Sequence, residues 1–111
     1  MPALVLLNGR AWMPGWTDLT DPERAYRQIA VLAEEQFDDT GDRVERIRVD
    51  DGPDATVAVA VTLRVGDRIA TCLGRLRPTP DRYWVDVDSA LAQMAAEWRA
   101  ARVRVGAVHA E

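Results

Sequence analysis

The segment Ala55–Arg77 alternates apolar and polar residues on both sides of the pair Gly66-Asp67. This pattern predicts two antiparallel strands joined by a two-residue type II′ turn, with Gly66 first. In that register eight small or apolar residues share one face of the hairpin, as the pairs Leu63 and Ala70, Val61 and Cys72, Val59 and Gly74, and Val57 and Leu76. We expect this face to form the core.

Two amphipathic segments flank the hairpin. The first, predicted over 20–40, opens with Thr20 and Glu23 at capping-box spacing and ends at Gly41. The second is predicted over 88–103, with Asp88 or Ser89 as its cap. Both segments place apolar residues three and four positions apart, which is typical of a helix with one buried face: Tyr26, Ile29, Ala33 and Phe37 in the first, and Leu91, Met94, Ala95 and Trp98 in the second.

The rest of the chain supplies further strands. Residues 1–16 contain Asn8-Gly9, a strong hairpin turn signal, and we expect a strand or hairpin there. Antiparallel strands are expected across 43–87, including a short one over Tyr83–Val87, and a flexible tail over 105–111. With 111 residues the chain is expected to be a single domain. The predicted fold class is α+β, a two-layer sandwich in which an antiparallel sheet of four to five strands packs two helices on one face.

Composition restricts the partners and the compartment. The net charge is −4, which argues against general binding to nucleic acid or to an anionic membrane surface. Cys72 is the only cysteine, so no intramolecular disulfide forms, and the N-terminus resembles no signal peptide or membrane span. We expect a cytoplasmic protein. Every basic side chain is an arginine, which donates to two oxygens at once where a lysine acts as a point charge.

Few residues are suited to catalysis. Ser89 is the only serine and fits a helix cap, while His109 is the only histidine and falls in the predicted tail. A catalytic triad is therefore not expected. Three groups of aspartates flank predicted turns or the second helix, but none has the alternating spacing of a calcium loop, and aspartate is a common turn residue. We expect no metal site and no cofactor; the groups are Asp38, Asp39 and Asp42, then Asp50, Asp51 and Asp54, then Asp86 and Asp88.

The predicted outer face of the hairpin carries Arg64, Arg75 and Arg77 among small residues. Such a face either binds phosphates or carboxylates of a partner, or is an ordinary solvated sheet face. Ile69 and Leu73 lie on the same face, which indicates that something covers part of it. The N-terminal hairpin and a second subunit are the two possible covers.

Four tryptophans in a chain of this length also require an explanation. Trp98 belongs to the apolar stripe of the second helix and is expected in the core. Trp12, Trp16 and Trp84 lack such a position, and exposed tryptophans are enriched in protein interfaces. Trp12 and Trp16 either contact a partner or cover the open end of the core.

From Asp21 onward the order helix, three strands, helix is similar to the double-stranded RNA-binding domain. Gly52-Pro53-Asp54 and the alanine-rich run 92–96 are similar to landmarks of that family. The family reads phosphates with lysines at the start of its last helix, where this chain has Asp86-Val87-Asp88-Ser89. Acidic residues there repel phosphate, so the resemblance covers the order of elements and does not predict RNA binding.

The sequence therefore favours a non-catalytic protein-interaction domain that binds a protein partner or itself, as a homodimer. An adaptor, an immunity-type inhibitor, a chaperone and an assembly subunit all fit this description. The predicted binding residues are Arg64, Arg75, Arg77, Trp12, Trp16 and Trp84. Two alternatives remain: a nucleic-acid-binding module that uses the arginines, and a ligand-binding protein or enzyme with a pocket of aspartate and arginine.

Overall fold

The computed structural model describes residues 3–13 and 19–109, with side chains as far as Arg102. Strands and helices follow one another along the chain as β1 (Leu4–Leu7), β2 (Arg10–Trp12), α1 (Asp21–Asp38), β3 (Arg43–Asp51), β4 (Val57–Val65), β5 (Arg68–Leu76) and α2 (Tyr83–His109). In the part described, neither helix has a stretch that is both long and apolar enough to cross a membrane.

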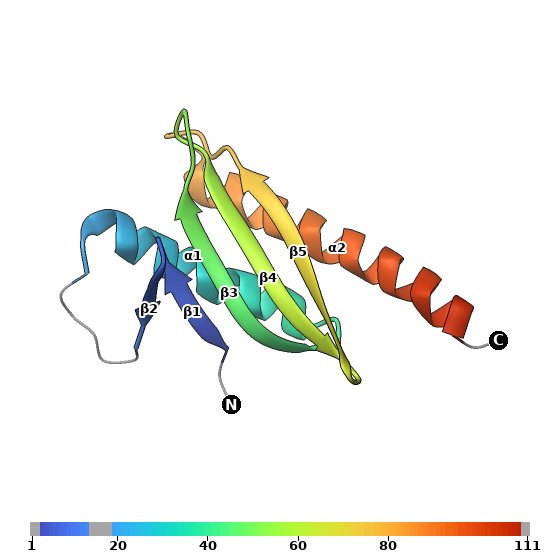
Figure 1. Cartoon of the computed structure of the whole chain (residues 1–111). Coiled ribbons are helices and arrows are strands. Elements are labelled where there is room, and N and C mark those ends of the chain that lie inside the picture. Colours follow the sequence, from blue (N-terminus) through green and yellow to red (C-terminus); the bar gives the residue numbers. More distant parts are fainter. Residues whose placement is uncertain (1–2, 14–18, 110–111) are drawn as a thin grey trace.

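The strands form one sheet in the order β2-β1-β3-β4-β5 (Figure 1). Three of the four neighbouring pairs are antiparallel, and β1 runs parallel to β3. A parallel pair needs a long crossover connection, which α1 supplies between β2 and β3. The predicted α+β class is confirmed, although the sheet is mixed where an antiparallel one was expected.

The central hairpin has the predicted register. Val57, Val59, Val61 and Leu63 lie opposite Leu76, Gly74, Cys72 and Ala70. Gly66 has a φ of 64°, the left-handed conformation that the first position of a type II′ turn requires. The Asn8-Gly9 turn is also confirmed, because both residues have positive φ and join β1 to β2.

Helix α1 begins as its sequence indicates. The side chain of Thr20 accepts a hydrogen bond from the Glu23 N–H, and the Glu23 carboxylate accepts one from the Thr20 N–H at 2.8 Å. This is a complete capping box. The helix ends before Gly41, whose φ is 85°, so the predicted termination is confirmed as well.

Helix α2 begins earlier than predicted, and the strand expected over Tyr83–Val87 is wrong. Val87 is fully buried while Val85 is 54% exposed, which two-residue alternation does not allow. Val87, Leu91 and Met94 instead follow helical spacing and face the core together. Asp88 and Ser89 are therefore inside the helix and cap nothing. The helix also continues to His109, past the point where a flexible tail was expected.

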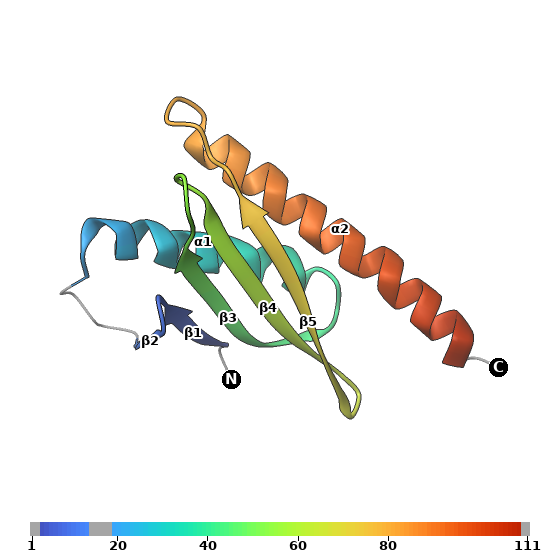
Figure 2. The same cartoon turned by 45° about the horizontal axis from the view of Figure 1, so that its top comes forward.

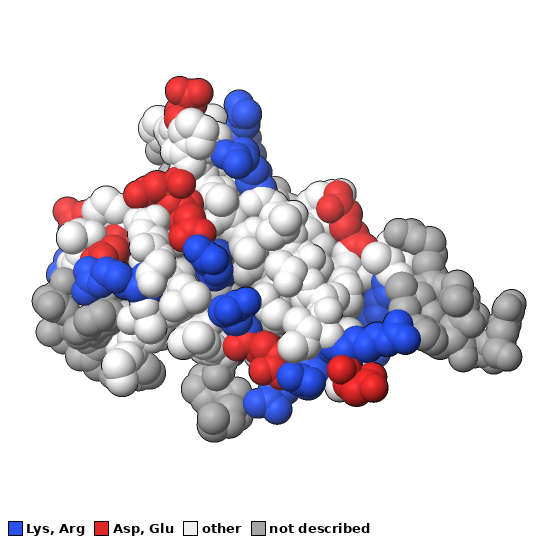
Figure 3. Space-filling model, viewed as in Figure 1, with Lys and Arg blue, Asp and Glu red and all other residues white. Residues whose placement is uncertain are grey.

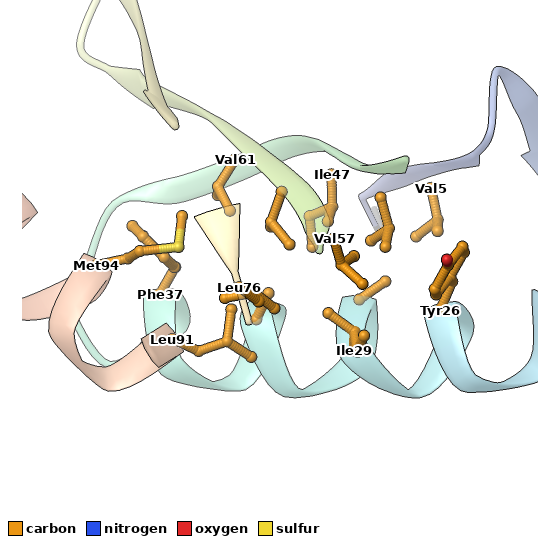
Figure 4. Packing of buried hydrophobic residues seen from close by; sticks show 14 of the residues in the cluster. Val5, Tyr26, Ile29, Phe37, Ile47, Val57, Val61, Leu76, Leu91 and Met94 are labelled. Carbon is orange, nitrogen blue, oxygen red and sulfur yellow. The ribbon is translucent and has the colours of Figure 1, made fainter. Parts of the chain in front are cut away.

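The core lies between the sheet and both helices, which cover the same face of the sheet (Figures 1 and 2). Figure 4 shows Ile29 and Phe37 of α1, with Leu91 and Met94 of α2, pointing toward Val61 and its neighbours on the strands. The predicted inward face of β4 is buried throughout, from Val57 at 4% exposed to Leu63 at 0%. The other face of the sheet, which we call the open face, has no helix on it within the described chain.

The N-terminal hairpin does not cover the open face. Its strands β1 and β2 instead lengthen the sheet beside β3. The sequence left two possible covers for Ile69 and Leu73, the N-terminal hairpin and a second subunit. Residues 3–13 of the hairpin do not cover them.

Candidate functional site

The open face is built from alternate residues of the five strands. Their positions follow from the strand register, since residues paired across strands point to the same side of a sheet. Arg46 pairs with Thr62 and Arg48 with Ala60, so β3 is in phase with the hairpin, as expected. The face comprises Leu4, Leu6, Ala11, Arg43, Arg46, Arg48, Asp50, Ala58, Ala60, Thr62, Arg64, Ile69, Thr71, Leu73 and Arg75.

Apolar side chains on the open face are unusually exposed. Leu73 is 79% exposed, Ile69 58% and Leu4 48%. Figure 3 looks onto this face and shows an uncharged area over the middle of β4 and β5, with charged side chains of both signs around its margin. An apolar centre with a polar rim is the arrangement found in protein interfaces.

Leu4 and Leu6 belong to this face but were not predicted as part of it. The apolar run of β1 alternates in burial, with Val5 and Leu7 in the core and Leu4 exposed. A run that is apolar throughout does not indicate which of its residues face inward. The pairing of β1 with β3 therefore determines that Leu4 lies on the open face.

A bulge in β3 places Glu45 against the arginines of the face. The register between β3 and β4 shifts between Val44 and Arg46 and leaves Glu45 without a cross-strand partner. Its carboxylate lies 2.7 Å from Nε of Arg64 and 3.6 Å from Nε of Arg43. The hydrogen bond from Arg64 lowers the pKa of Glu45 below its usual value. Arg64 is therefore already paired with an acid of its own chain.

Other arginines of the face differ in how well they are paired. Arg48 lies 3.5 Å from the carboxylate of Asp50. Arg75 contacts a neutral group, the hydroxyl oxygen of Thr56, at 3.4 Å. Arg46 has no ion pair or side-chain hydrogen bond within the described chain. The positive charge expected from the sequence is therefore partly neutralised.

A hollow of about 480 Å³ lies across β3, β4 and β5 on the open face. Its floor is Ala58 and Ala60 on β4, whose methyl groups leave space between longer side chains on the neighbouring strands. One row across the strands reads Arg48, Ala60, Leu73, and the next reads Asp50, Ala58, Arg75. The small residues predicted to accompany the arginines thus form a trough, with Leu73 standing beside it.

The remaining predicted binding residues lie elsewhere. Arg77 is exposed just after β5. Trp12 pairs with Val5 on the helix-facing side of the sheet, is half-buried against the core, and has Arg27 over its ring at 5.6 Å. Trp84 is 45% exposed at the start of α2, in edge contact with Tyr83. Trp16 lies outside the described residues.

Several of the aspartates accept hydrogen bonds within the fold. Asp42 accepts from Trp98 and Arg102, and Asp51 accepts from the hydroxyl of Tyr26 and the amide of Asn8. Burial, together with the hydrogen bond to Asp51, raises the pKa of Tyr26 far above its ordinary value. Asp86 accepts from the backbone and hydroxyl of Thr79, which lowers its pKa. No group of three metal-ligating side chains occurs in the parts of the chain that are described.

A second hollow, of about 450 Å³, lies between the β4–β5 turn and α2. Its lining is largely apolar and includes Val65, Ile69 and Trp98. Asp67, Arg68 and Arg102 are also in the lining, but the guanidinium of Arg102 is held by Asp42. The ligand-binding alternative requires a pocket lined by aspartate and arginine, and this hollow has such a lining. One of its arginines, Arg102, already forms an ion pair with Asp42.

Comparison of the sequence with known proteins identifies no relative whose site could be compared with this one. The chain matches no protein-family model and no curated protein. A functional proposal has to rest on the shape and chemistry of the surface itself.

Proposed function

We propose that this chain is a non-catalytic protein-interaction domain that binds protein through the open face of its sheet. The observation that supports this most directly is the exposure of Leu73, Ile69 and Leu4 on one uncovered face with charges at its margin. Exposed apolar area of this kind is costly in water unless a partner covers it. The cytoplasm is the proposed compartment, supported by a single unpaired Cys72.

The groups near the open face support binding better than catalysis. Its carboxylates, Glu45 and Asp50, are turned toward arginines of the same chain. Catalysis by an acid and a base needs a group whose proton is free to move to a substrate. The only serine is an exposed residue inside α2. We accordingly propose roles such as adaptor, immunity-type inhibitor, chaperone or assembly subunit.

Binding of nucleic acid is less well supported than binding of protein. Phosphate recognition needs basic side chains whose charge is not already compensated. Arg64 and Arg48 are paired with Glu45 and Asp50, which leaves Arg46 and Arg75 as the arginines of the described face without an acid, and the area over the middle of β4 and β5 is uncharged. A duplex would meet apolar side chains where it needs cations.

The experiment compares two substitutions that add the same charge, both at exposed positions. Leu73→Asp places a carboxylate on the open face, while Val85→Asp places one on an exposed position of α2. Each variant, and the unchanged chain, is expressed with an affinity tag in its native cells, and co-purifying proteins are quantified. We expect at least one protein to be lost with Leu73→Asp and retained with Val85→Asp.

An identical set of co-purifying proteins for both variants would contradict a role for the open face. Binding of duplex RNA or DNA at low salt that Leu73→Asp leaves unchanged would favour the nucleic-acid alternative instead. The far-ultraviolet circular dichroism of both variants serves as the control for folding.

A further inference from the structure

On the open face, a projecting apolar side chain, Leu73, lies beside a hollow with an apolar floor. Leu73 projects from β5 with 79% of its surface exposed. Ala60, directly opposite it on β4, forms the floor of the hollow of about 480 Å³ together with Ala58. The hollow has room for a leucine side chain, and its alanine floor is apolar.

We propose that a second copy of this chain covers the open face, with Leu73 of each copy seated in the hollow of the other. This inference rests on the proposed function and names its partner. A two-fold axis that lies parallel to the two sheets and midway between them brings the same patch of both copies together, so a surface that holds both the projection and the depression suits this symmetry. The two sheets then stack face to face, about 10 Å apart.

The charges around the hollow favour a second copy over a strongly charged partner. Its rim holds both signs, with Arg48 and Arg75 on one hand and Asp50 on the other. In a pair of such faces, Asp50 of each copy can meet an arginine of the other. Arg75, which contacts only the hydroxyl of Thr56 among described residues, is available for such a carboxylate.

The size of the face is also suitable. With strands about 4.8 Å apart and about 3.4 Å of rise per residue, β1 and β3–β5 span about 500 Å² in projection. Side-chain relief raises the accessible area above this value, toward the roughly 800 Å² per partner of a standard interface. Association through the edge of β5 is less favourable, because α2 runs along the outer side of this strand (Figure 2).

Sedimentation equilibrium of the purified full-length chain tests the proposal. We expect a monomer–dimer equilibrium that Leu73→Asp weakens by about tenfold or more, since the carboxylate would have to enter an apolar hollow. Val85→Asp, at 54% exposure on α2, should leave the equilibrium unchanged. A chain that stays monomeric up to millimolar concentration overturns the proposal.

Ala60→Leu distinguishes a seated leucine from general adhesion of apolar surfaces. The new side chain fills the hollow, so a seated Leu73 predicts weaker dimerisation, whereas general adhesion predicts stronger dimerisation. Since Ala60 points away from the core, the substitution should leave folding intact. Stronger dimerisation of Ala60→Leu overturns the proposal.

A cross-linking experiment gives a second, independent measurement. In a background of Cys72→Ser, a Leu73→Cys chain is mixed with an Ala58→Cys chain under mild oxidation. We expect the mixed disulfide to form faster than either symmetric disulfide, because each Leu73 faces the alanine floor of the other copy. Equal rates for all three disulfides overturn the proposed seating.

Failure of this proposal is distinguishable from failure of the proposed function. A monomeric chain that still loses a co-purifying protein on Leu73→Asp has an open face that binds a different protein. If the chain is monomeric and Leu73→Asp leaves its co-purifying proteins unchanged, the open face does not bind protein.

Discussion

At the residue scale, the most consequential polar side chain is Asp42. Its side chain is 4% exposed, yet it accepts hydrogen bonds from Trp98 Nε1 at 2.9 Å and from Arg102 Nε at 2.8 Å. These bonds tie the segment between α1 and β3 to the middle of α2. A buried carboxylate is tolerated only when its oxygens are satisfied, which the two donors achieve.

Asp42→Ala should destabilise the protein by about 1–3 kcal/mol, because it leaves the indole N–H of Trp98 without an acceptor. Arg102 is half-exposed, so water compensates part of its loss. Asp42→Asn is the matched control, since its amide oxygen retains one acceptor and should recover part of the loss. Urea unfolding measures both variants; equal losses for the two would show that the acceptor for Trp98 is unimportant.

At the element scale, the start of α1 is bound to the N-terminal hairpin. Glu23 completes the capping box and also accepts a hydrogen bond from Arg10 of β2 at 3.0 Å. The backbone N–H of Thr20 is the main cause of the lowered pKa of Glu23, and burial acts in the opposite direction. One carboxylate therefore joins two elements and depends on its negative charge to do so.

This lowered pKa has a consequence for stability at different pH values. A carboxyl group with a lowered pKa in the folded state stabilises the fold above its ordinary value of 4.5, and that contribution is lost as the pH falls through the folded pKa. Glu23→Gln keeps the capping geometry and removes the charge. We expect the variant to be less stable than the unchanged chain at neutral pH and the difference to narrow well below 4.5.

Thermal unfolding at a series of pH values measures this difference. Glu45 and Asp86 also have lowered pKa values, so the unchanged chain should lose stability in acid even when Glu23 is replaced. A difference between variant and unchanged chain that is constant from neutral to acidic pH would contradict the assignment.

At the scale of the whole molecule, the sheet separates folding from binding by its two faces. Val59 is 2% exposed and faces the helices, while its neighbour Ala58 points into the hollow of the open face. The same substitution at these adjacent positions should therefore have different effects.

Val59→Asp should cost about 4 kcal/mol or more, since it buries a carboxylate without a partner. A domain of this size has a total stability of about 5–15 kcal/mol, so the substitution should remove a large part or all of the stability. Ala58→Asp should cost about 1 kcal/mol or less and weaken association instead. Urea unfolding and sedimentation of the two variants separate these effects, and a Val59→Asp chain as stable as the unchanged chain would contradict the assignment of faces.

Short stretches of sequence predict much of this fold. The register of β4 and β5 follows from two-residue alternation and one glycine at the turn, and α1 follows from Thr20, Glu23 and a periodic apolar stripe. Such signals are local, because turn geometry and backbone capping involve residues only a few positions apart. The strand predicted over Tyr83–Val87 is wrong because residues four positions apart, such as Tyr83 and Val87, share one face in a strand and also in a helix. Only the continuation of the pattern to Leu91 and Met94 distinguishes the helix.

The candidate site depended on the tertiary structure far more. The sequence placed Arg64, Arg75, Ile69 and Leu73 on one face, and the hairpin register alone accounts for that. The bulge that turns Glu45 toward Arg64, and the parallel pairing that brings Leu4 to the open face, join residues far apart in the chain. A hollow forms only where small residues of one strand lie between long residues of its neighbours, and pairing between strands decides which rows meet.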